Sequence, residues 1–345
     1  LMDVNVVLCG FGNVGRALGR LIEDRRSHVY EKYDINFICN AVIASKGSVV
    51  SDKHLPLSEI ADFVDNGGRL DTFPEFGRMG YDFRKAVNDL PVGAMFESTL
   101  TDIMTGGIGL EHFEIAIENN CNVISANKGP LVLKMPELMK AASEKGLKLK
   151  YSGATAAALP TTDVGLICFA GSTIQKIEGI FTATTNLLLT RMAETGQSYE
   201  EALKEAQELG VAETDPSLDV EGWDTANKTV ILANSFFECE LRLSDVKVEG
   251  ITGLDPSFVK DAKDNGSEVK LLGVAEVIDD EIKAYVKPVS VEPDHPLFGI
   301  NGTSKGIAFT SDTLGAITVT GGKAGPDGTA ASMLKDFINI YRKDK

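Results

Sequence analysis

The chain has 345 residues, of which 43% are hydrophobic and 24% are charged, a composition typical of folded globular proteins and not of disordered ones. Its length favours a nucleotide-sized domain joined to a second domain. Lys and Arg number 34 against 50 Asp and Glu, and the net charge of −16 disfavours binding to nucleic acid or to anionic membrane surfaces.

Strand-like and helical segments alternate over residues 1–150, as in a parallel sheet with crossover helices. The first strand-like segment is continuously apolar, which is typical of a strand buried on both faces. We therefore predict an α/β fold with a Rossmann-type doubly wound parallel sheet. The predicted strands are Asn5–Cys9, Ile35–Ala44, Gly93–Glu97, Asn122–Ser125 and Leu147–Tyr151, and the predicted helices are Val14–Glu31, Ile108–Asn119 and Pro136–Lys145, the last with Pro136 near its first turn.

The pattern changes after Gly153, where helices alternate with further strand-like runs. Ser198 and Glu201 form a capping box for a helix that ends near Gly210. We expect an α+β catalytic and dimerisation domain over residues 151–315, and a C-terminal segment, 316–345, that returns to the first domain. The predicted strands are Lys176–Thr182, Lys247–Gly250 and Glu281–Val289, and helices are predicted over Asp224–Phe237 and within Gly321–Tyr341.

Three glycines directly follow the first predicted strand. Gly10, Gly12 and Gly15 fit the pattern G-x-G-x-x-G where a helix begins. Gly10 permits a tight turn, Gly12 lets the backbone approach a pyrophosphate, and Gly15 lets helix and strand pack closely. The motif predicts dinucleotide binding, and a purely structural turn is the alternative.

The end of the second strand bears on the choice of coenzyme. Chains that bind NAD place an acid there for the ribose 2′-hydroxyl, whereas this chain has Ser45 and Lys46. A hydroxyl and an ammonium suit a 2′-phosphate, and the alternative is a lysine that is merely solvated. The pattern favours NADP over NAD.

Two further residues follow the ends of predicted strands. Thr99 comes after the strand that ends at Glu97, and Lys128 comes after the strand that ends at Ser125. Ligands of open α/β sheets bind at the carboxyl ends of the strands, so both residues are candidates to face a cofactor. Each is equally compatible with an ordinary loop position.

The densest group of polar side chains lies between residues 213 and 228. Glu213 and Asp219 belong to an acidic stretch that precedes a predicted helix, in which Asp224 and Lys228 stand four residues apart on one face. One interpretation is a surface loop with a helix-stabilising ion pair, worth about 0.3 to 0.5 kcal/mol. The other is a pocket for a cationic substrate with a lysine as proton donor.

The histidines and cysteines predict no metal site. None of the four histidines has a partner at ligand spacing, which also disfavours acid catalysis by histidine. The five cysteines form an odd set without close pairs, which predicts reduced thiols in the cytoplasm, with neither a disulfide framework nor a zinc site. Apolar neighbours predict that Cys9, Cys39 and Cys168 are core residues.

Neither a membrane segment nor a secretory signal is expected. No apolar run approaches the roughly 20 residues that span a bilayer. The N-terminus also lacks a basic segment followed by an apolar one.

The chain resembles homoserine dehydrogenases over essentially its whole length. The glycine motif is only a small part of this resemblance, and the combination of the other segments is highly specific. These segments are Ser125–Lys128, Gly179–Asn186 with Leu189–Met192, Glu201–Gly210 with the acidic stretch up to Lys228, and Gly322–Gly325 with Thr329–Ala330.

The resemblance implies reversible NAD(P)H-dependent reduction of L-aspartate 4-semialdehyde to L-homoserine, in threonine and methionine biosynthesis, by a homodimer formed through the middle domain. It assigns the catalytic lysine to Lys228 and its partner to Asp224, with Lys128 near the reacting carbon. The residues that it assigns to the substrate are Glu213, Asp219 and Thr184, and those that it assigns to the cofactor are Phe11, Asn13, Val14, Thr99, Lys128 and Gly325.

The chain also departs from the family pattern. Ser152–Pro160 lacks the acid beside the Gly-rich turn that often holds a monovalent cation, which argues against such an ion near Thr155–Leu159. Thr182–Leu187 replaces the usual Asn-Gly-Thr-Thr-Asn-Tyr, and Val211 replaces a common Tyr, which predicts a pocket of different shape. Because the chain stops near Lys345, we expect no regulatory domain and no cooperative inhibition by threonine.

Two other functions remain compatible with the sequence. One is a related amino-acid or aldehyde dehydrogenase on the same framework. The other is a non-catalytic NADP-binding sensor, in which Lys228 is a structural ion-pair lysine. The presence of both Lys128 and Lys228 together with the acids argues against the sensor.

Overall fold

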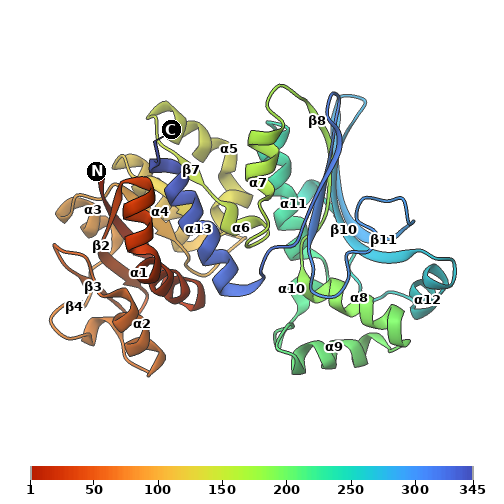
Figure 1. Cartoon of the computed structure of the whole chain (residues 1–345), viewed down its shortest axis with the longest axis horizontal. Helices are drawn as coiled ribbons and strands as arrows, with labels where there is room; N and C mark the ends of the chain where they lie inside the picture. Colours follow the sequence, from red (N-terminus) through yellow and green to blue (C-terminus); the bar gives the residue numbers. More distant parts are fainter. Residues whose placement is uncertain (1, 344–345) are drawn as a thin grey trace. The chain divides into compact units, whose positions relative to one another are not determined.

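The computed structural model describes residues 2–343, which form two compact units (Figure 1). Unit 1 contains the chain up to Ala157 and the segment from Gly325 onward, and unit 2 is Ala158–Ala324. The limits predicted from the sequence, 150 and 315, lie a few residues before these boundaries.

Unit 1 contains a seven-stranded sheet in the order β4-β3-β2-β1-β5-β6-β7. The strand β1 (Met2–Cys9) pairs in parallel with β2 (Ile35–Ala44) on one side and with β5 (Ala94–Glu97) on the other. The Rossmann-type sheet predicted from the sequence is therefore confirmed, and its order reverses between β1 and β5, where such sheets bind ligands. The remaining strands are β6 (Asn122–Ser125) and β7 (Leu149–Lys150), which extend the parallel part, and β3 (Gly47–Val50) and β4 (Gly77–Arg78), which form an antiparallel edge.

The core of unit 1 lies between this sheet and its helices. The first helix, α1 (Asn13–Tyr33), packs beside the last, α13 (Gly325–Tyr341) (Figure 1). The rings of Phe37 in β2 and Phe337 in α13 meet edge to face with centroids 4.9 Å apart, so the C-terminal helix supplies part of the core. The other helices are α2 (Leu57–Asp65), α3 (Phe83–Asp89), α4 (Gly107–Glu118), α5 (Gly129–Glu144) and α6 (Ser152–Thr155), with a 3₁₀ turn, η1 (Leu70–Thr72).

The helix α5 consists of two helical segments joined by a kink. The backbone of Lys134 is non-helical, with φ −140° and ψ 28°. The second segment starts directly after this kink and has Pro136 in its first turn, where a proline needs no N–H partner, as the sequence predicted. The first segment, which begins at Gly129 with Pro130 in its first turn, was not predicted.

Unit 2 contains a six-stranded sheet in the order β13-β12-β8-β10-β11-β9. Its longest hairpin turns at Asp279 and Asp280, which both have positive φ (53° and 63°), as a two-residue type I′ turn requires. The sequence predicted three of the six strands. Those are β8 (Ile174–Ile180), β9 (Lys247–Val248) and β11 (Glu281–Val291), and the strands missed are β10 (Glu268–Ile278), β12 (Gly306–Ser311) and β13 (Gly315–Thr320).

Two helices of unit 2, α8 (Ala183–Thr195) and α11 (Trp223–Phe236), contact β10. The helix α9 (Tyr199–Glu208) begins with the predicted capping box: Ser198 Oγ accepts from the Glu201 backbone, and the Glu201 carboxylate accepts from the Ser198 backbone. The remaining short elements are α7 (Thr161–Asp163), a π turn η2 (Val164–Cys168), α10 (Ser217–Val220), a 3₁₀ turn η3 (Leu243–Asp245) and α12 (Pro256–Asp264).

All five cysteines are free thiols. Cys9 and Cys39 are buried as predicted, but Cys168 is exposed at the end of η2. The apolar run around Cys168 predicted burial, whereas this single π turn also leaves Leu166 and Ile167 exposed. Within residues 2–343, every helix is too short or too polar to cross a membrane.

Candidate active site

The glycine motif forms the turn between β1 and α1. Gly10 has a φ of +92°, and a Cβ there would lie 2.4 Å from the Ser98 carbonyl carbon. A Cβ on Gly15 would lie 2.3 Å from the Gly10 oxygen. A Cβ on Gly12, in contrast, would meet nothing within 4 Å, so this face is open to an approaching ligand. The packing thus requires glycine at the first and last positions and leaves the middle one free for a phosphate.

The N-terminus of α1 is suited to an anion. Gly12 is its N-cap and gives no side-chain hydrogen bond, and the first turn contains no acid. Backbone N–H groups and the helix dipole are therefore available to a phosphate. The side chains of Phe11 and Val14 pack in or against the apolar core, while Asn13 Oδ1 accepts from Arg16 at 2.9 Å. A cofactor contact at Phe11 or Val14 would consequently use the backbone.

Ser45 and Lys46 form the exposed turn between β2 and β3. The adjoining Gly47 has a φ of +113°, and a Cβ there would lie 2.5 Å from Asp71 Cβ. Asp71 of η1 is thus an acid near this turn. The sequence alone did not indicate it, because only the fold brings η1 beside the end of β2. Its carboxylate accepts from Arg69 Nε and Nη2 at 3.1 and 2.7 Å. Arg69 neutralises the negative charge of this carboxylate, so the positive charge on the exposed turn is that of Lys46.

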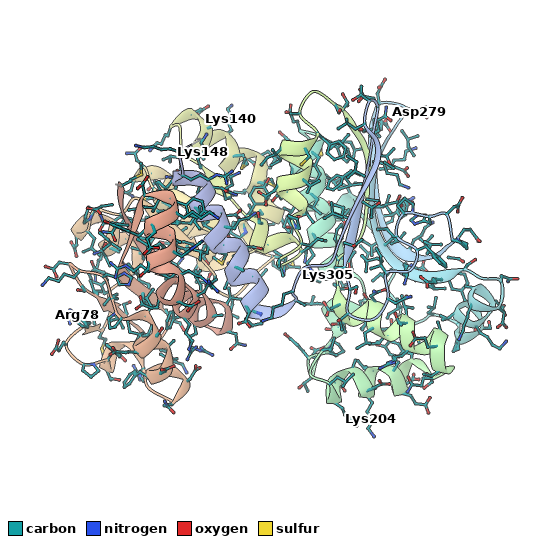
Figure 2. All side chains as sticks on the ribbon, in the orientation of Figure 1. Arg78, Lys140, Lys148, Lys204, Asp279 and Lys305 are labelled. Atoms are coloured by element: carbon teal, nitrogen blue, oxygen red, sulfur yellow. The ribbon has the colours of Figure 1, made fainter. Side chains whose placement is uncertain are left out.

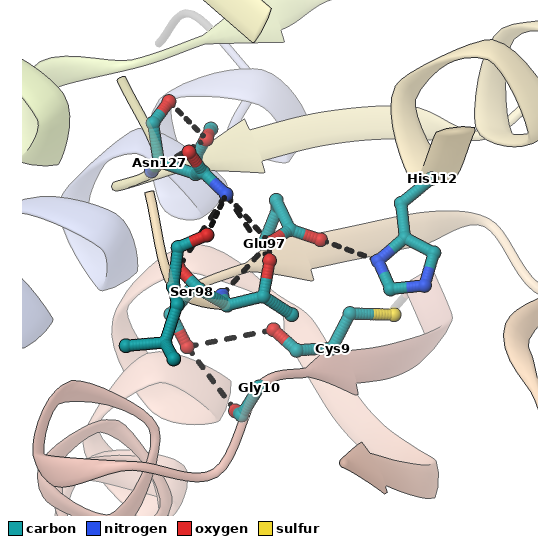
Figure 3. Close-up of polar contacts among 9 residues, drawn as sticks. Cys9, Gly10, Glu97, Ser98, His112 and Asn127 are labelled. Carbon is teal, nitrogen blue, oxygen red and sulfur yellow. Dashed lines mark hydrogen bonds and ion pairs between the residues drawn. The ribbon is translucent and has the colours of Figure 1, made fainter. Parts of the chain in front are cut away.

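A buried hydrogen-bond network joins the ends of β1, β5 and β6 (Figure 3). Glu97 Oε1 accepts from the Thr99 backbone at 2.8 Å and also from the Thr99 hydroxyl. Asn127 Nδ2 donates to Thr99 Oγ1 at 3.1 Å, and Asn127 Oδ1 accepts from Gly129 N at 3.0 Å. The network therefore fixes both loops, one carrying Thr99 and the other carrying Lys128, which is the half-buried N-cap of α5.

His112 extends this network, which the sequence spacing did not reveal. Its Nδ1 lies 2.7 Å from Glu97 Oε2, and Cys9 brings a third potential ligand atom within 4.8 Å of these two side chains (Figure 3). Burial, and then the charge of Glu97, raise the pKa of the Cys9 thiol well above its usual range. A protonated thiol and a carboxylate already hydrogen-bonded on both oxygens fit a polar core better than a metal centre.

A buried acid also lies beside the Ser152 turn, although the segment Ser152–Pro160 itself contains none. It comes from the distant helix α13: Asp336 Oδ2 accepts from the Ser152 backbone at 2.9 Å, and Oδ1 accepts from the Ser152 hydroxyl at 2.8 Å. Lys335 Nζ lies 3.0 Å from Oδ1. Burial raises the pKa of Asp336. These contacts occupy the carboxylate, and the absence of a cation near Thr155–Leu159 stays a prediction.

In unit 2, α11 presents the predicted pair of Asp224 and Lys228. Their side chains are 2.6 Å apart and only 15% and 13% exposed. Lys228 Nζ also donates to the Phe181 carbonyl at 2.8 Å, at the end of β8. Burial and this second hydrogen bond distinguish the pair from an exposed surface ion pair, which was one interpretation of the sequence.

The remaining predicted substrate residues lie on different elements of unit 2. Glu213 is exposed in the bend between α9 and α10, and Asp219 is half-buried in α10. Thr184 is buried in the first turn of α8, and its hydroxyl donates to the Val211 carbonyl at 3.4 Å. Gly325, predicted at the cofactor, is the first residue of α13 in unit 1 and has a φ of +80° with nothing within 4 Å of a Cβ.

The chain has relatives that it matches over nearly their full length. A family model described as homoserine dehydrogenase matches residues 160–338. A homoserine dehydrogenase from Methanocaldococcus jannaschii is 33% identical over 342 residues, which cover 99% of this chain and 100% of that protein. An NAD(+)-dependent homoserine dehydrogenase from Pseudomonas canavaninivorans is 33% identical over 346 residues, which cover 99% of this chain and 97% of that protein.

Solved structures have the same fold. A crystal structure from Archaeoglobus fulgidus, provisionally assigned as a homoserine dehydrogenase, has a TM-score of 0.87 at 32% identity and covers 99% of this chain and 100% of its own. A hyperthermophilic archaeal homoserine dehydrogenase mutant in complex with NADPH has a TM-score of 0.84 at 23% identity, over 98% and 97% of the two chains, and supports the fold alone. Because the family model matches residues 160–338 and the Methanocaldococcus protein matches nearly the whole of this chain, the chain belongs to the homoserine dehydrogenase family.

Proposed function

We propose that the chain catalyses the reversible NAD(P)H-dependent reduction of L-aspartate 4-semialdehyde to L-homoserine, with Lys228 as the proton donor. The observation that carries the proposal is the setting of this ammonium, 2.6 Å from Asp224 and 2.8 Å from the Phe181 carbonyl. These two contacts use two of its three N–H groups, and the third can be donated to the aldehyde oxygen.

A spectrophotometric assay tests the reaction in both directions. Absorbance of NADPH is expected to fall when aspartate 4-semialdehyde is added and to rise from NADP⁺ when L-homoserine is added. A chain that binds NADPH but changes its absorbance with neither substrate would contradict the proposal.

The proposed roles follow from the charges that the reaction creates. The bound nicotinamide supplies the hydride that reduces the aldehyde carbon. The aldehyde oxygen then gathers negative charge, which the Lys228 ammonium stabilises before it gives up a proton to that oxygen. Asp224 keeps the ammonium oriented. Lys128 is proposed as a second ammonium near the reacting carbon.

NADP is the proposed coenzyme, with NAD as a weaker substitute. The N-terminus of α1 and the glycine turn suit the pyrophosphate, and the turn of Ser45 and Lys46 suits the 2′-phosphate. Phe11, Asn13, Val14, Thr99, Lys128 and Gly325 complete the proposed cofactor site.

The substitution Lys46→Glu is expected to shift coenzyme preference from NADP toward NAD. An acid on this exposed turn repels the 2′-phosphate and accepts from the ribose 2′-hydroxyl of NAD. The measurement is the ratio of kcat/KM for the two coenzymes, with Lys53→Glu, another exposed lysine of unit 1, as the charge control. An unchanged ratio in Lys46→Glu would show that Lys46 is merely solvated.

Glu213 and Asp219 are proposed to receive the α-ammonium of the substrate, with Thr184 close to it. The substitution Glu213→Gln is expected to raise KM for the amino-acid substrate about ten- to a hundredfold and to change kcat much less, because the ammonium is bound alike in the ground and transition states. The measurement is the steady-state kinetics of Glu213→Gln, with Glu208→Gln, which replaces an exposed acid of α9, as the control. An effect on kcat alone would place Glu213 in the chemical step instead.

We also propose a cytoplasmic homodimer. Five free thiols suit a reducing compartment. Unit 2 exposes large apolar side chains at Leu166, Ile167, Val277 and Leu314, which is typical of surface that another subunit covers. Sedimentation velocity at micromolar concentration tests the assembly, and a monomer there would contradict it.

A further inference from the structure

The Lys228 ammonium is held between two elements of unit 2, and what fixes its position is a further question that rests on the proposed function. Its Nζ lies 2.6 Å from Asp224 and 2.8 Å from the Phe181 carbonyl. The first partner belongs to α11 itself, whereas the second directly follows β8. Because the two partners lie on different elements, the distance between α11 and the sheet decides where the ammonium stands.

Two glycines face each other in this sheet. Gly179 of β8 and Gly273 of β10 are directly paired in the antiparallel register. From this pair β10 runs to the hairpin turn at Asp279, which Figure 2 labels. Glycine weakens the interior of a strand, and two opposite glycines also lack a cross-strand side-chain contact. Such a pair indicates that other groups must approach the backbone closely at this place.

The ring of Phe181 is the first of these groups. A Cβ on Gly179 would lie 2.3 Å from Phe181 Cε1, and a Cβ on Gly273 would lie 3.1 Å from Phe181 Cε2. The ring, which is 1% exposed, therefore lies over both glycines. Because the ring and the carbonyl belong to one residue, close packing of the ring also restricts the carbonyl that accepts from Lys228.

The helix α11 is the second group, and its contact with Gly273 is closer. A Cβ on Gly273 would lie 2.3 Å from Thr229 Oγ1 and 2.8 Å from Thr225 Cγ2, and both threonines are fully buried. Thr229 Oγ1 also donates to the Thr225 carbonyl at 2.8 Å, which holds the hydroxyl in place. Asp224 and Lys228 each directly precede one of these threonines, so they lie on the adjacent helix face, turned by about 100°. The packing of α11 on Gly273 thereby sets the reach of Lys228.

We infer that Gly273 and Gly179 are positioning residues for the proton donor. The missing side chain at Gly273 lets α11 approach β10 closely enough for Lys228 to reach the Phe181 carbonyl. Gly179 leaves space for the Phe181 ring. A methyl group at either position would overpack this contact, shift one partner of the ammonium and misplace the ammonium relative to the aldehyde oxygen.

The substitution Gly273→Ala is expected to lower kcat for oxidation of L-homoserine by NADP⁺ about ten- to a hundredfold, which is the effect of a misplacement of about 1 Å. KM for L-homoserine and Kd for NADPH should stay nearly unchanged, because the proposed substrate acids and the glycine turn lie on other elements. The measurements are steady-state kinetics and NADPH fluorescence titration, with kcat expressed per folded protein from circular dichroism.

A second substitution on the helix separates positioning from a general loss of stability. Thr229→Ala removes the atom nearest to the new methyl group, so the double variant Gly273→Ala with Thr229→Ala should regain part of the lost kcat. The recovery should be incomplete, because Thr225 Cγ2 would still lie 2.8 Å from the new methyl group. Thr229→Ala alone should keep kcat near that of the unmodified protein.

The matched control is Gly253→Ala. Gly253 also belongs to unit 2, but a Cβ there would meet nothing within 4 Å, so kcat and KM should not change. Gly179→Ala tests the other half of the contact and should lower kcat as Gly273→Ala does. If the alanine variants do not fold, Phe181→Leu removes the ring from the glycines without altering the backbone, and it should lower kcat at unchanged KM.

Each outcome bears on the inference. A kcat of folded Gly273→Ala equal to that of Gly253→Ala overturns it, as does a loss of kcat that Thr229→Ala does not relieve. A rise in KM with kcat unchanged also overturns it, since the glycines would then shape the substrate pocket. If the fallback Phe181→Leu keeps normal kcat, the inference is likewise overturned.

The proposed function can be judged separately. If the unmodified protein does not oxidise L-homoserine, or if Lys228→Ala keeps normal turnover, the proposed function or the role of Lys228 fails and the inference fails with it. If Lys228→Ala is inactive while Gly273→Ala is normal, only the inference fails and the proposed function stands.

Discussion

Replacing Lys228 with alanine is expected to lower kcat by about a hundred- to ten-thousandfold, because the variant lacks the proton donor and the charge that stabilises the aldehyde oxygen. Binding of NADPH should survive, since the glycine turn and the N-terminus of α1 belong to unit 1, whereas Lys228 belongs to unit 2. The measurements are kcat from NADPH absorbance and the Kd for NADPH from fluorescence titration.

The matched control is Lys260→Ala in α12. Lys260 also forms an ion pair with an acid four residues away on its helix, in this case the following Asp264, but both side chains are exposed. This variant should keep normal turnover. Because the pair of Lys228 with Asp224 is mostly buried, Lys228→Ala should lose about 1 to 3 kcal/mol of unfolding free energy, more than a surface pair contributes.

Chemical rescue provides a further test of the role of Lys228. Small primary amines added to Lys228→Ala should restore part of the turnover, because a free ammonium can take the place of the lost one. Turnover that falls only in proportion to the fraction of unfolded protein, or that stays near normal, would contradict the mechanism.

Removing the Glu97 carboxylate is expected to give the largest loss of stability among the proposed substitutions. In Glu97→Ala, Thr99 and His112 lose their acceptor inside the core of unit 1, and Asn127 loses one of its partners. Leaving such groups without partners should lower the free energy of unfolding by about 3 to 5 kcal/mol. Chemical denaturation monitored by circular dichroism provides the measurement.

The control for Glu97→Ala is Glu144→Ala, an exposed acid at the end of α5, which should be nearly neutral. Glu97→Gln keeps the volume and one of the two acceptor oxygens and should lose less stability than Glu97→Ala. A loss below about 1 kcal/mol in Glu97→Ala would show that the network does not stabilise the loops of Thr99 and Lys128.

Elements specified by their own residues were predictable from the sequence. The strand β2, the capping box at Ser198 and the i,i+4 pair on α11 depend on local patterns, and the structure contains each of them. The glycine turn after Cys9 was also predictable. A tight turn, a face open to a ligand and close packing of helix on strand each select glycine, and they do so at a fixed spacing.

Elements specified by distant partners were not predictable. The missed strand β10 contains Gly273, which weakens a local strand pattern, yet a Cβ there would lie 2.3 Å from Thr229 Oγ1 of α11. The hydrogen bond between Glu97 and His112 likewise depends on the packing of β5 against α4 and is not indicated by the sequence.

The place of α13 in the core of unit 1 has a consequence for the order of events on the ribosome. The residues of unit 2 form one uninterrupted segment and can fold as soon as they emerge, whereas unit 1 lacks Phe337 and its neighbours until after all of unit 2 has been synthesised. After its first segment has been made, unit 1 therefore stays incomplete, with Phe37 uncovered, during the synthesis of the about 170 residues of unit 2. Shielding of nascent apolar surface by chaperones is most valuable during that interval.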